Sequence, residues 1–527
     1  MLLPAGICLA SGLVHASLWL DEITYYYGER DMALRAAELG RPGSPVAPHL
    51  GIFFFCDVQR LVHALVEPLG LTVFRDPELY LRLTSMIAYA VAALALWAYL
   101  RRRLERRTDA LLGALAFSST PILLHYAFEA RVYAMTTMLV VLLAIALDAA
   151  ARAPSRGRLV AVSGLALLAA HSHLWTLCLF AALLAAAGFD TVRERGLSGF
   201  SRSALAAAVP ALVLIGAQVL FMRATDPGAP LFEPFKRQDA VVTLVQLVFS
   251  NFFGVLQTQY VVGTSLKTAI LAWTGGAALV VAAAVSLRGA PTVPAVRGGA
   301  PWTAVATLSL LLCWLLAVTY GYYTQARYHV PLLGMLFFGI GLRPSRPGRL
   351  LLGLVVAVNA GLLPSTVEAI GRKGSAREVA ALIRARETRD AAVVCQHVVT
   401  GGFPLPAQAI GLDFYLNALH PDEPPVPVLE MPDLAPVNGR RGVYDLFAGG
   451  APVQQHYLAS RPEAWRKVRS ELPPNVFVLQ QFWNVAAGLE QSASFESVML
   501  EAGDWTVRGK YFVPGFPRSY LVEFRKK

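Results

Sequence analysis

Charged residues are scarce in this chain. Asp, Glu, Lys and Arg account for 15% of its 527 residues and hydrophobic residues for 55%, and the mean hydropathy is +0.50. A water-soluble protein of this length needs more charged side chains to cover its surface. The shortage of charge therefore excludes a wholly soluble protein.

Cysteine is scarce too, and no two cysteines have the CxxC spacing of a metal site or a redox motif. The five cysteines lie mostly within apolar segments, at positions 8, 56, 178, 313 and 395. The first apolar segment lacks the basic residues that open a cleaved signal peptide, and Asp21 and Glu22 follow it at once. We therefore expect neither a disulfide framework nor an ordinary cleaved signal, and we find no internal repeat.

Apolar segments, by contrast, are abundant, in blocks of roughly 17 to 25 residues that match the ~30 Å of hydrocarbon in a bilayer. About eleven spans are predicted, at 3–20, 79–100, 109–126, 133–151, 159–173, 174–189, 204–222, 268–287, 301–319, 327–342 and 350–365. A further apolar stretch, 240–262, contains several amide side chains and is interpreted as a helix lying at the membrane interface. The blocks stop near Pro364, where the composition becomes that of a globular domain.

Arginine clusters mark alternate loops between these spans. The five clusters contain sixteen basic residues, in the segments 101–107, 152–158, 193–202, 288–297 and 343–349. The positive-inside rule places these loops in the cytoplasm. The other loops and the whole C-terminal domain are then extracytoplasmic, and any chemistry is expected on that outer face. The net charge of +11 thus reflects membrane topology, and no basic stripe that would bind nucleic acid is present.

Two carboxylates, Asp21 and Glu22, end the first predicted span. They could be a solvated helix end, or a general base or metal ligand held at the membrane surface. Glu129 and Arg131 interrupt a long apolar run in a later outer corner. Because residues two apart do not face each other on a helix, we expect these two to have different partners.

Two further outer corners contain polar residues. His171 and His173 precede Trp175, and a single histidine there is more often a hydrogen-bonded core residue than a ligand. Arg327 enters a late span, where its side chain could simply reach the interface. A bundle would bring all these corners together, and such a set suits an anionic leaving group and a nucleophile that loses a proton.

Four segments in order resemble the GT-C class of membrane glycosyltransferases, and within it the protein O-mannosyltransferase and aminoarabinose-transferase group. They are Trp19-Leu20-Asp21-Glu22, then 48–54 with Leu81-Arg82-Leu83, then Phe128-Glu129-Ala130-Arg131-Val132-Tyr133, and Ala326-Arg327-Tyr328 followed by Pro331. The chain departs from the group's proline-rich segment at His49, Gly51 and Thr84. Residues 45–60 also lack the lysine that some members place near the lipid phosphate.

The resemblance implies a sugar donor carried on a polyprenyl phosphate and a hydroxyl acceptor on a lipid, glycan or protein. A lipid phosphate leaves without a general acid but needs positive charge, so one carboxylate base suffices for inverting displacement. The roles implied are Asp21 as base with Glu22 as its partner, Arg82, Arg131 and Arg327 as phosphate ligands, and Tyr133, Tyr328 and His173 as residues that shape the site. Some relatives use a divalent metal ion, for which Glu129 or His173 could be ligands.

We thus predict a polytopic α-helical membrane protein of the cell (inner or plasma) membrane, with a GT-C-like catalytic domain at 1–365 and an extracytoplasmic α/β domain at 366–527. In the latter, helices are expected at 375–386, 412–419 and within 442–472. Strands are expected at 391–395, 426–429, 476–479, 497–500, 505–511 and 520–524. This domain could bind the acceptor or cover the membrane cavity. A lipid or polysaccharide flippase and a non-catalytic scaffold remain as alternatives to an enzyme.

Overall fold

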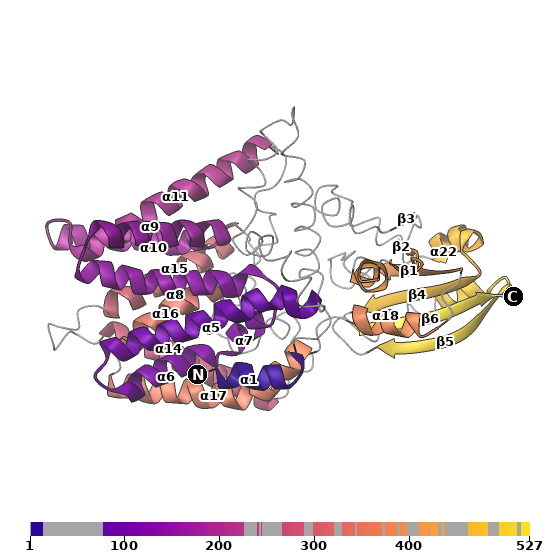
Figure 1. The fold of residues 1–527 in the computed structure, drawn as a ribbon, viewed down its shortest axis with the longest axis horizontal. Coiled ribbons are helices and arrows are strands. Elements are labelled where there is room, and N and C mark those ends of the chain that lie inside the picture. Colours follow the sequence, from indigo (N-terminus) through magenta and orange to yellow (C-terminus); the bar gives the residue numbers. More distant parts are fainter. Residues whose placement is uncertain are drawn as a thin grey trace. The chain divides into compact units, whose positions relative to one another are not determined.

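The computed structural model divides into two compact units, a first that ends at Ala369 and a second that extends from Ile370 to Lys527. The first unit is a helix bundle and the second contains a β-sheet (Figure 1). The structure describes residues 2–13, 77–225, 240–241, 244, 266–288, 299–320, 329–342, 345–371, 375–386, 390–397, 411–420, 422–430, 435–436, 462–482, 495–513 and 518–527.

The first unit is built from apolar helices of very different lengths. They are α1 (Leu3–Ala10), α5 (Pro77–Arg103), α6 (Arg107–Ser118), α7 (Pro121–Ala127), α8 (Val132–Arg152), α9 (Arg156–Ser172), α10 (Thr176–Arg193), α11 (Gly199–Thr225), α14 (Leu266–Arg288), α15 (Gly299–Tyr320), α16 (Val330–Gly341) and α17 (Arg346–Gly371). Within the described residues, six helices are long and apolar enough to cross a membrane, or seven if α6 and α7 form one bent span. This confirms a multi-pass membrane protein. The count of eleven spans stays a prediction, and most of 240–262 lies outside the described residues.

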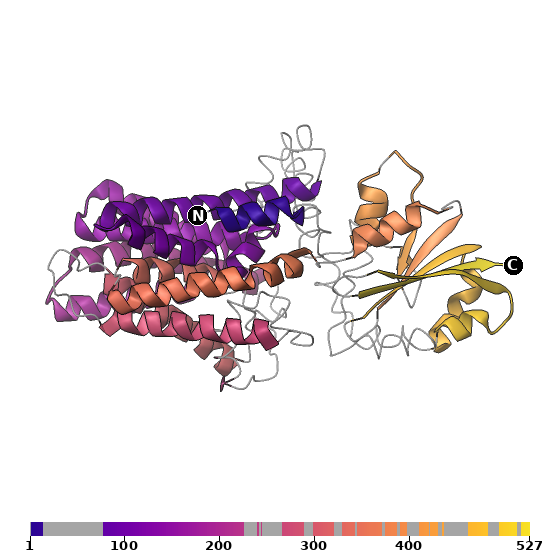
Figure 2. The same cartoon turned by 90° about the horizontal axis from the view of Figure 1, so that it is seen from below.

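Helix α8 lies inside the bundle. It contacts α5, α9, α11 and α16, and Figures 1 and 2 show the helices running side by side. In the most apolar part of α8, 67% of the residues are buried, against at most 39% in the other candidate spans. Both ends of α8 are therefore surrounded by several helices. A buried carboxylate lies near each end, Glu129 just before its first residue and Asp148 in its last turns.

Asp148 is a buried charge near the C-terminal end of α8, with 1% of its surface exposed. Its carboxylate accepts hydrogen bonds from the Tyr99 hydroxyl, from Arg152 Nε at 3.1 Å and from Trp302 Nε1 at 3.1 Å. Arg103 Nε is 3.6 Å away. The Asp148 network therefore joins α5, α8 and α15 at an end where two of the predicted arginine clusters meet.

Helices α15 and α16 approach each other closely at Gly339. A Cβ atom there would come within 2.6 Å of both the backbone nitrogen and Oγ1 of Thr303. The close approach thus requires a glycine, because a backbone atom cannot move aside as a flexible side-chain end can.

We expect Gly339→Ala to destabilise the bundle by about 1–3 kcal/mol, the usual cost of overpacking a tight contact. Thermal unfolding of purified protein in detergent would measure the effect. Gly164→Ala on α9 is the control, because a Cβ there meets nothing within 4 Å. Equal melting temperatures for the two variants would contradict the close approach.

The break between α6 and α7 bends this candidate span by 65°. Pro121 causes it, because proline has no N–H to continue the helix and keeps Thr120 extended (ψ 123°). The groups freed at the break are bonded locally. Asn359 of α17 donates through Nδ2 to Ser119 Oγ at 3.0 Å, and the Thr120 hydroxyl donates to the Ala116 carbonyl at 2.7 Å. The bend is thus stable inside an apolar bundle.

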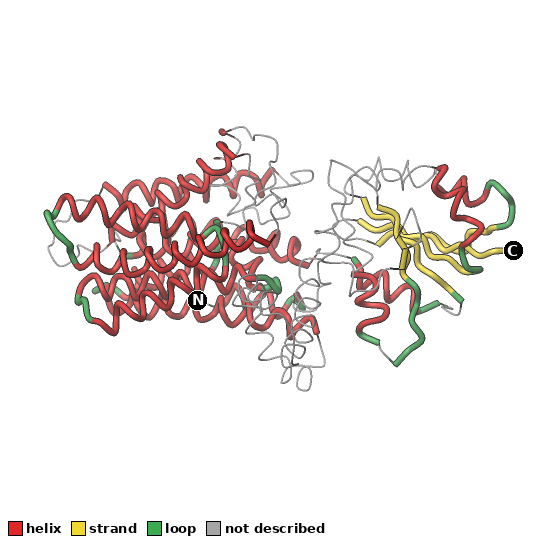
Figure 3. Tube along the Cα trace, turned by 90° about the horizontal axis from the view of Figure 1, so that it is seen from above, coloured by secondary structure: helices red, strands yellow, loops and turns green. Residues whose placement is uncertain are grey.

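The second unit is a six-stranded mixed sheet in the order β3-β2-β1-β4-β6-β5. The strands are β1 (Ala391–His397), β2 (Val428–Glu430), β3 (Ala435–Pro436), β4 (Asn475–Phe482), β5 (Trp505–Val513) and β6 (Arg518–Lys526). β1 pairs in parallel with β2 and β4, and the other pairs are antiparallel. Figures 2 and 3 show helices on both faces, with α18 (Ala376–Arg384) on one side and α22 (Pro462–Val468) on the other. The predicted small C-terminal sheet is confirmed.

One strand prediction in this unit is wrong, because residues 495–500 are helical. Phe495, Val498 and Met499 are buried against Trp465 of α22, whereas Ser497 and Leu500 are exposed. This spacing of three and four residues is the period of a helix, while a strand would bury alternate residues. The apolar stretch Val498 to Leu500 is too short to show that period by itself.

Candidate functional site at the corner between helices α7 and α8

The corner between α7 and α8 forms because α7 ends at Ala127 and the next four residues turn back. The Arg131 amide donates to the Glu129 carbonyl at 2.8 Å, and Arg131 itself is extended (φ −138°, ψ 155°) as the residue that precedes α8. Arg131 and Glu129 thus lie in a turn and not on a helix.

Glu129 occupies the centre of this corner and is 2% exposed. Its two oxygens have different neighbours. His125 Nε2 is 3.2 Å from Oε2, and Arg131 Nη1 is 3.8 Å from Oε1. A buried carboxylate requires such neighbours, since desolvation without them costs several kcal/mol, on the order of a whole domain's margin of stability. The expectation that Glu129 and Arg131 have separate partners is therefore wrong, because the turn lets residues two apart meet.

Aromatic rings extend the corner toward a second loop. The Arg131 guanidinium lies 5.2 Å from the centre of the Tyr133 ring, a cation–π distance. Tyr133 in turn packs against Tyr126 at 4.6 Å and His173 at 5.3 Å. His173 comes from the turn between α9 and α10, so the bundle brings two of the predicted outer corners together.

Arg82 lies on α5, which passes beside the corner, and its side chain is fully buried. Its Nη1 donates to the Leu13 carbonyl at 3.2 Å, and Ser85, one turn further along α5, donates through Oγ to the Arg131 carbonyl at 3.3 Å. One face of α5 thus contacts both the corner and Leu13, which precedes Asp21 by only eight residues in the sequence.

Of the nine predicted site residues, the structure describes Arg82, Glu129, Arg131, Tyr133 and His173. It places the last four at this corner, and Arg82 lies one turn of α5 before Ser85, which contacts the corner. The other four, Asp21, Glu22, Arg327 and Tyr328, lie outside the described residues.

His125 is not among the predicted site residues, although its Nε2 lies 3.2 Å from Glu129 Oε2. The signal in the sequence is its position four residues before Glu129, close enough for the last turn of α7 and the turn that follows it to bring the two side chains together.

Among the residues that the structure describes, the predicted metal ligands Glu129 and His173 do not belong to a larger ligand group. Across the described ranges, no set of three or more His, Cys, Asp or Glu side chains could hold a metal ion. Glu129 instead contacts His125 and Arg131.

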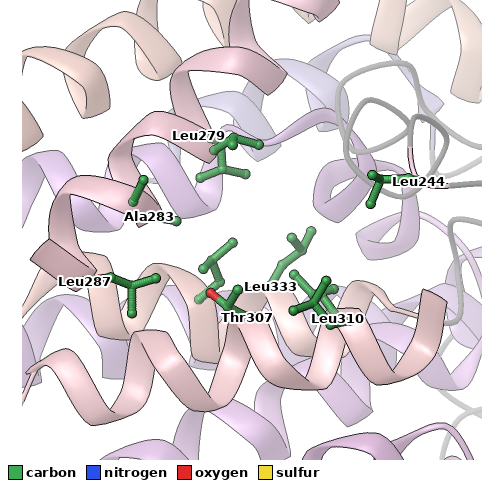
Figure 4. Close-up of a pocket in the computed structure, with 11 residues that line it drawn as sticks. Leu244, Leu279, Ala283, Leu287, Thr307, Leu310 and Leu333 are labelled. Carbon is green, nitrogen blue, oxygen red and sulfur yellow. The ribbon is translucent and has the colours of Figure 1, made fainter. Parts of the chain in front are cut away.

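An apolar pocket of about 290 Å³ lies elsewhere in the same unit, between α14, α15 and α16 (Figure 4). Leu279, Ala283 and Leu287 of α14 line it together with Leu310 of α15 and Leu333 of α16. Thr307 is the one polar residue among the eleven that line it. Several lining residues on the same helices reach the surface, such as Val280 at 48% and Leu311 at 46% exposed. The pocket is therefore suited to a hydrocarbon chain and open to the lipid phase.

Among the comparisons with known proteins, only the comparison of structures finds a similar protein. No protein-family model matches the chain, and no curated protein matches its sequence. Among solved structures, ArnT from Cupriavidus metallidurans in the apo state aligns with 99% of this chain and 97% of its own, at a TM-score of 0.55 and 14% sequence identity.

The fold is that of ArnT. ArnT is an aminoarabinose transferase of the GT-C class, so the resemblance found in the four sequence segments is confirmed as a resemblance of fold. The ArnT structure bound to undecaprenyl phosphate covers the same shares of both chains at 15% identity, with a TM-score of 0.42. At 14% identity, the likeness to ArnT shows a shared fold. The chemistry of this chain has to be argued from its own side chains.

Proposed function

We propose that this chain is an inverting membrane glycosyltransferase that moves a hexose or pentose from a polyprenyl phosphate to a hydroxyl group of a lipid, glycan or protein. The observation that carries the proposal is the buried corner itself. Glu129, Arg131, Tyr133 and His173 converge there in an ArnT-like bundle, and buried Arg82 lies one turn of α5 from Ser85, which contacts Arg131. Such buried charge is costly and is retained in membrane proteins mainly for function.

The proposed reaction is a single displacement. Asp21 takes the proton of the acceptor hydroxyl while the hydroxyl oxygen attacks the anomeric carbon of the sugar. The bond from that carbon to the phosphate oxygen breaks, and both of its electrons remain on the lipid phosphate. Arg131 and Arg82, with Arg327, stabilise the charge that develops there. Tyr133, Tyr328 and His173 shape the space for the sugar, and Glu22 assists Asp21.

The proposed topology has eleven spans, with the arginine-rich ends in the cytoplasm and the corner at 126–132 on the outer side. Ion pairs among those ends support a common side, since Arg349 of α17 lies 3.3 Å from Asp109 of α6, and Arg103 of α5 lies near Asp148 of α8. The C-terminal α/β domain, from residue 366, then lies outside the cell membrane. There it either binds the acceptor or covers the cavity.

The apolar pocket is proposed to hold part of the isoprenoid chain. Because α16 packs on α8, the helix that follows the corner, the pocket and the site share neighbouring helices. We expect Ala283→Trp to raise KM about tenfold for a long-chain donor, since excluding roughly 60 Å² of hydrocarbon costs about 1.4 kcal/mol. KM for a donor with a ten-carbon isoprenoid should not change.

Val281→Trp is the matched control for the pocket, because Val281 is 47% exposed on the same helix and does not line the pocket. Transfer kinetics in nanodiscs with both donors would measure the difference. A rise in KM that does not depend on chain length would contradict the proposed place of the chain.

The function itself is tested by transfer of radiolabelled sugar from polyprenyl phosphate in nanodiscs, with a membrane lipid extract as the acceptor source. Transfer by the wild-type chain supports the enzyme. Transport of the lipid across the bilayer without transfer would show a flippase, and binding of a partner with neither activity would show a scaffold. Either result would overturn the proposal. Two observations argue against a flippase. The charged residues lie at the end of a helix, whereas a translocation path would place them near the bilayer midplane, and the sequence has no repeated halves.

A further inference from the structure

The Asp148 network lies at the arginine-rich end of α8, opposite the corner described above. Both oxygens of its carboxylate already accept hydrogen bonds. Oδ2 accepts them from the Tyr99 hydroxyl and from Arg152 Nε, and Oδ1 accepts one from Trp302 Nε1. Arg152 also donates through Nη2 to the Tyr99 hydroxyl at 2.6 Å. These four side chains therefore form a closed set.

Arg103 of α5 approaches the same carboxylate without a hydrogen bond. Its Nε is buried and lies 3.6 Å from Asp148 Oδ2, beyond hydrogen-bond distance. Among the described residues, no other atom accepts a hydrogen bond from the Arg103 guanidinium, which has five N–H groups to donate. The side chain is 21% exposed. Because a half-buried guanidinium without acceptors is costly, an acceptor supplied from outside the chain would stabilise it.

The charge at this end of α8 is unbalanced. The single carboxylate of Asp148 faces two guanidinium groups, those of Arg103 and Arg152. Arg158 of α9 adds a third, because its Nη1 donates to two carbonyls of the last turns of α8 and of the residue that follows it, at 3.4 and 2.7 Å. The negative end of the α8 dipole offsets only about half a charge. More than one positive charge thus remains in excess around the end of α8.

The surroundings of this excess charge are those of a membrane surface. Apolar side chains are exposed on both flanking helices, with Leu94 of α5 at 44% and Val160 of α9 at 70%. The Arg101 guanidinium lies 5.4 Å from the centre of the Trp97 ring, and tryptophan near the end of a span is typical of the headgroup level. An anion with acyl chains fits such a surface better than a soluble anion does, because its chains can lie along the exposed apolar side chains.

We propose that the end of α8 binds the phosphate of an anionic phospholipid, which accepts hydrogen bonds from Arg103 and Arg152. In the proposed topology this lipid belongs to the cytoplasmic leaflet, where anionic lipids attract basic side chains. The site is separate from the proposed reaction, because the 21 residues of α8 place its two ends roughly 30 Å apart.

The test titrates the full-length chain, in a nonionic detergent, with dioleoyl phosphatidylglycerol and measures Kd by native mass spectrometry. Arg103→Gln is expected to raise Kd about tenfold, the effect of losing one hydrogen bond to a charged group. Phosphatidylcholine with the same acyl chains, whose choline cancels the phosphate charge, should bind at least about tenfold more weakly to the wild type.

Arg202→Gln is the matched control. Arg202 is an exposed arginine near the start of α11, and the substitution removes the same charge from the arginine-rich side. Its Kd for phosphatidylglycerol should stay within about twofold of the wild-type value, because exposed charges at a distance are screened by salt. Equal Kd values for the wild type, Arg103→Gln and Arg202→Gln would overturn the site.

Asp148→Asn gives a test of opposite sign. Without the carboxylate that competes for the arginines, phosphatidylglycerol should bind about fivefold more tightly, the effect of one unit charge ~4 Å away in water. Loss of structure would weaken binding instead, so an unchanged or higher Kd contradicts the proposal even if Arg103→Gln does not fold. Inorganic phosphate is the last arm. If it displaces the lipid at equal concentration, the site belongs to a free phosphate and the lipid proposal is wrong.

Discussion

Asp21→Asn is expected to lower the rate of sugar transfer about 10³-fold, within the usual contribution of a general base. Asparagine has the shape of aspartate but cannot take the proton of the acceptor hydroxyl. KM for the lipid donor should change by less than about threefold, because the arginines proposed to bind the phosphate are untouched. The measurement is steady-state transfer from a radiolabelled polyprenyl-phosphate sugar in nanodiscs.

Glu105→Gln provides the control for Asp21. Glu105 is an exposed carboxylate in the loop between α5 and α6, on the arginine-rich side of the bundle. Its loss should leave transfer unchanged. Transfer at the wild-type rate by Asp21→Asn would exclude Asp21 as the base, and the proton would then have to go to another carboxylate, for which Glu22 and Glu129 are the candidates to test next.

Asp148→Asn is expected to lower the free energy of unfolding by about 3 kcal/mol, the lower end of the cost of breaking a buried ion pair. The change leaves the positive charges of Arg103 and Arg152 without the carboxylate between them. The cost stays at the lower end because both arginines reach water, with 21% and 42% of their side chains exposed. Denaturant titration of the purified protein would measure the loss.

Asp190→Asn is the matched control for stability. The Asp190 carboxylate accepts hydrogen bonds from the Ser198 and Ser201 hydroxyls, which carry no charge. Its replacement should cost about 1 kcal/mol, the value of an ordinary hydrogen bond. Similar losses for the two variants would mean that the arginines do not depend on Asp148.

The sequence was informative where one residue pattern determines the local outcome. Glu129 and Arg131 stood out because charge within an apolar run has few explanations, and the described structure does place both at a buried corner. The arginines likewise mark helix ends, as at Arg103 of α5 and Arg152 of α8. Helix and strand bounds in the C-terminal unit mostly followed from hydrophobic periodicity.

The contacts that depend on three-dimensional packing could not be predicted. Trp302 donates to Asp148 across 154 positions of the sequence, and nothing near either residue indicates the pairing. The Glu129–Arg131 contact was misjudged because the end of α7 at Ala127, which decides it, was not known. For Asp21 and Arg327, whose surroundings are not described, the sequence remains the basis of the assignment.

The bend at Pro121 also bears on how deep in the membrane the proposed reaction would take place. The 12 residues of α6 advance about 18 Å along its axis, and the 7 residues of α7, inclined by 65°, add only about 4 Å. With Arg107 at the water interface, the corner that follows α7 then lies several ångströms short of the far side of a ~30 Å hydrocarbon layer. A lipid phosphate would have to sink to meet Arg131, and the acceptor would have to descend to the same depth. Such a geometry favours an acceptor that is itself anchored in the membrane over one that diffuses in from water.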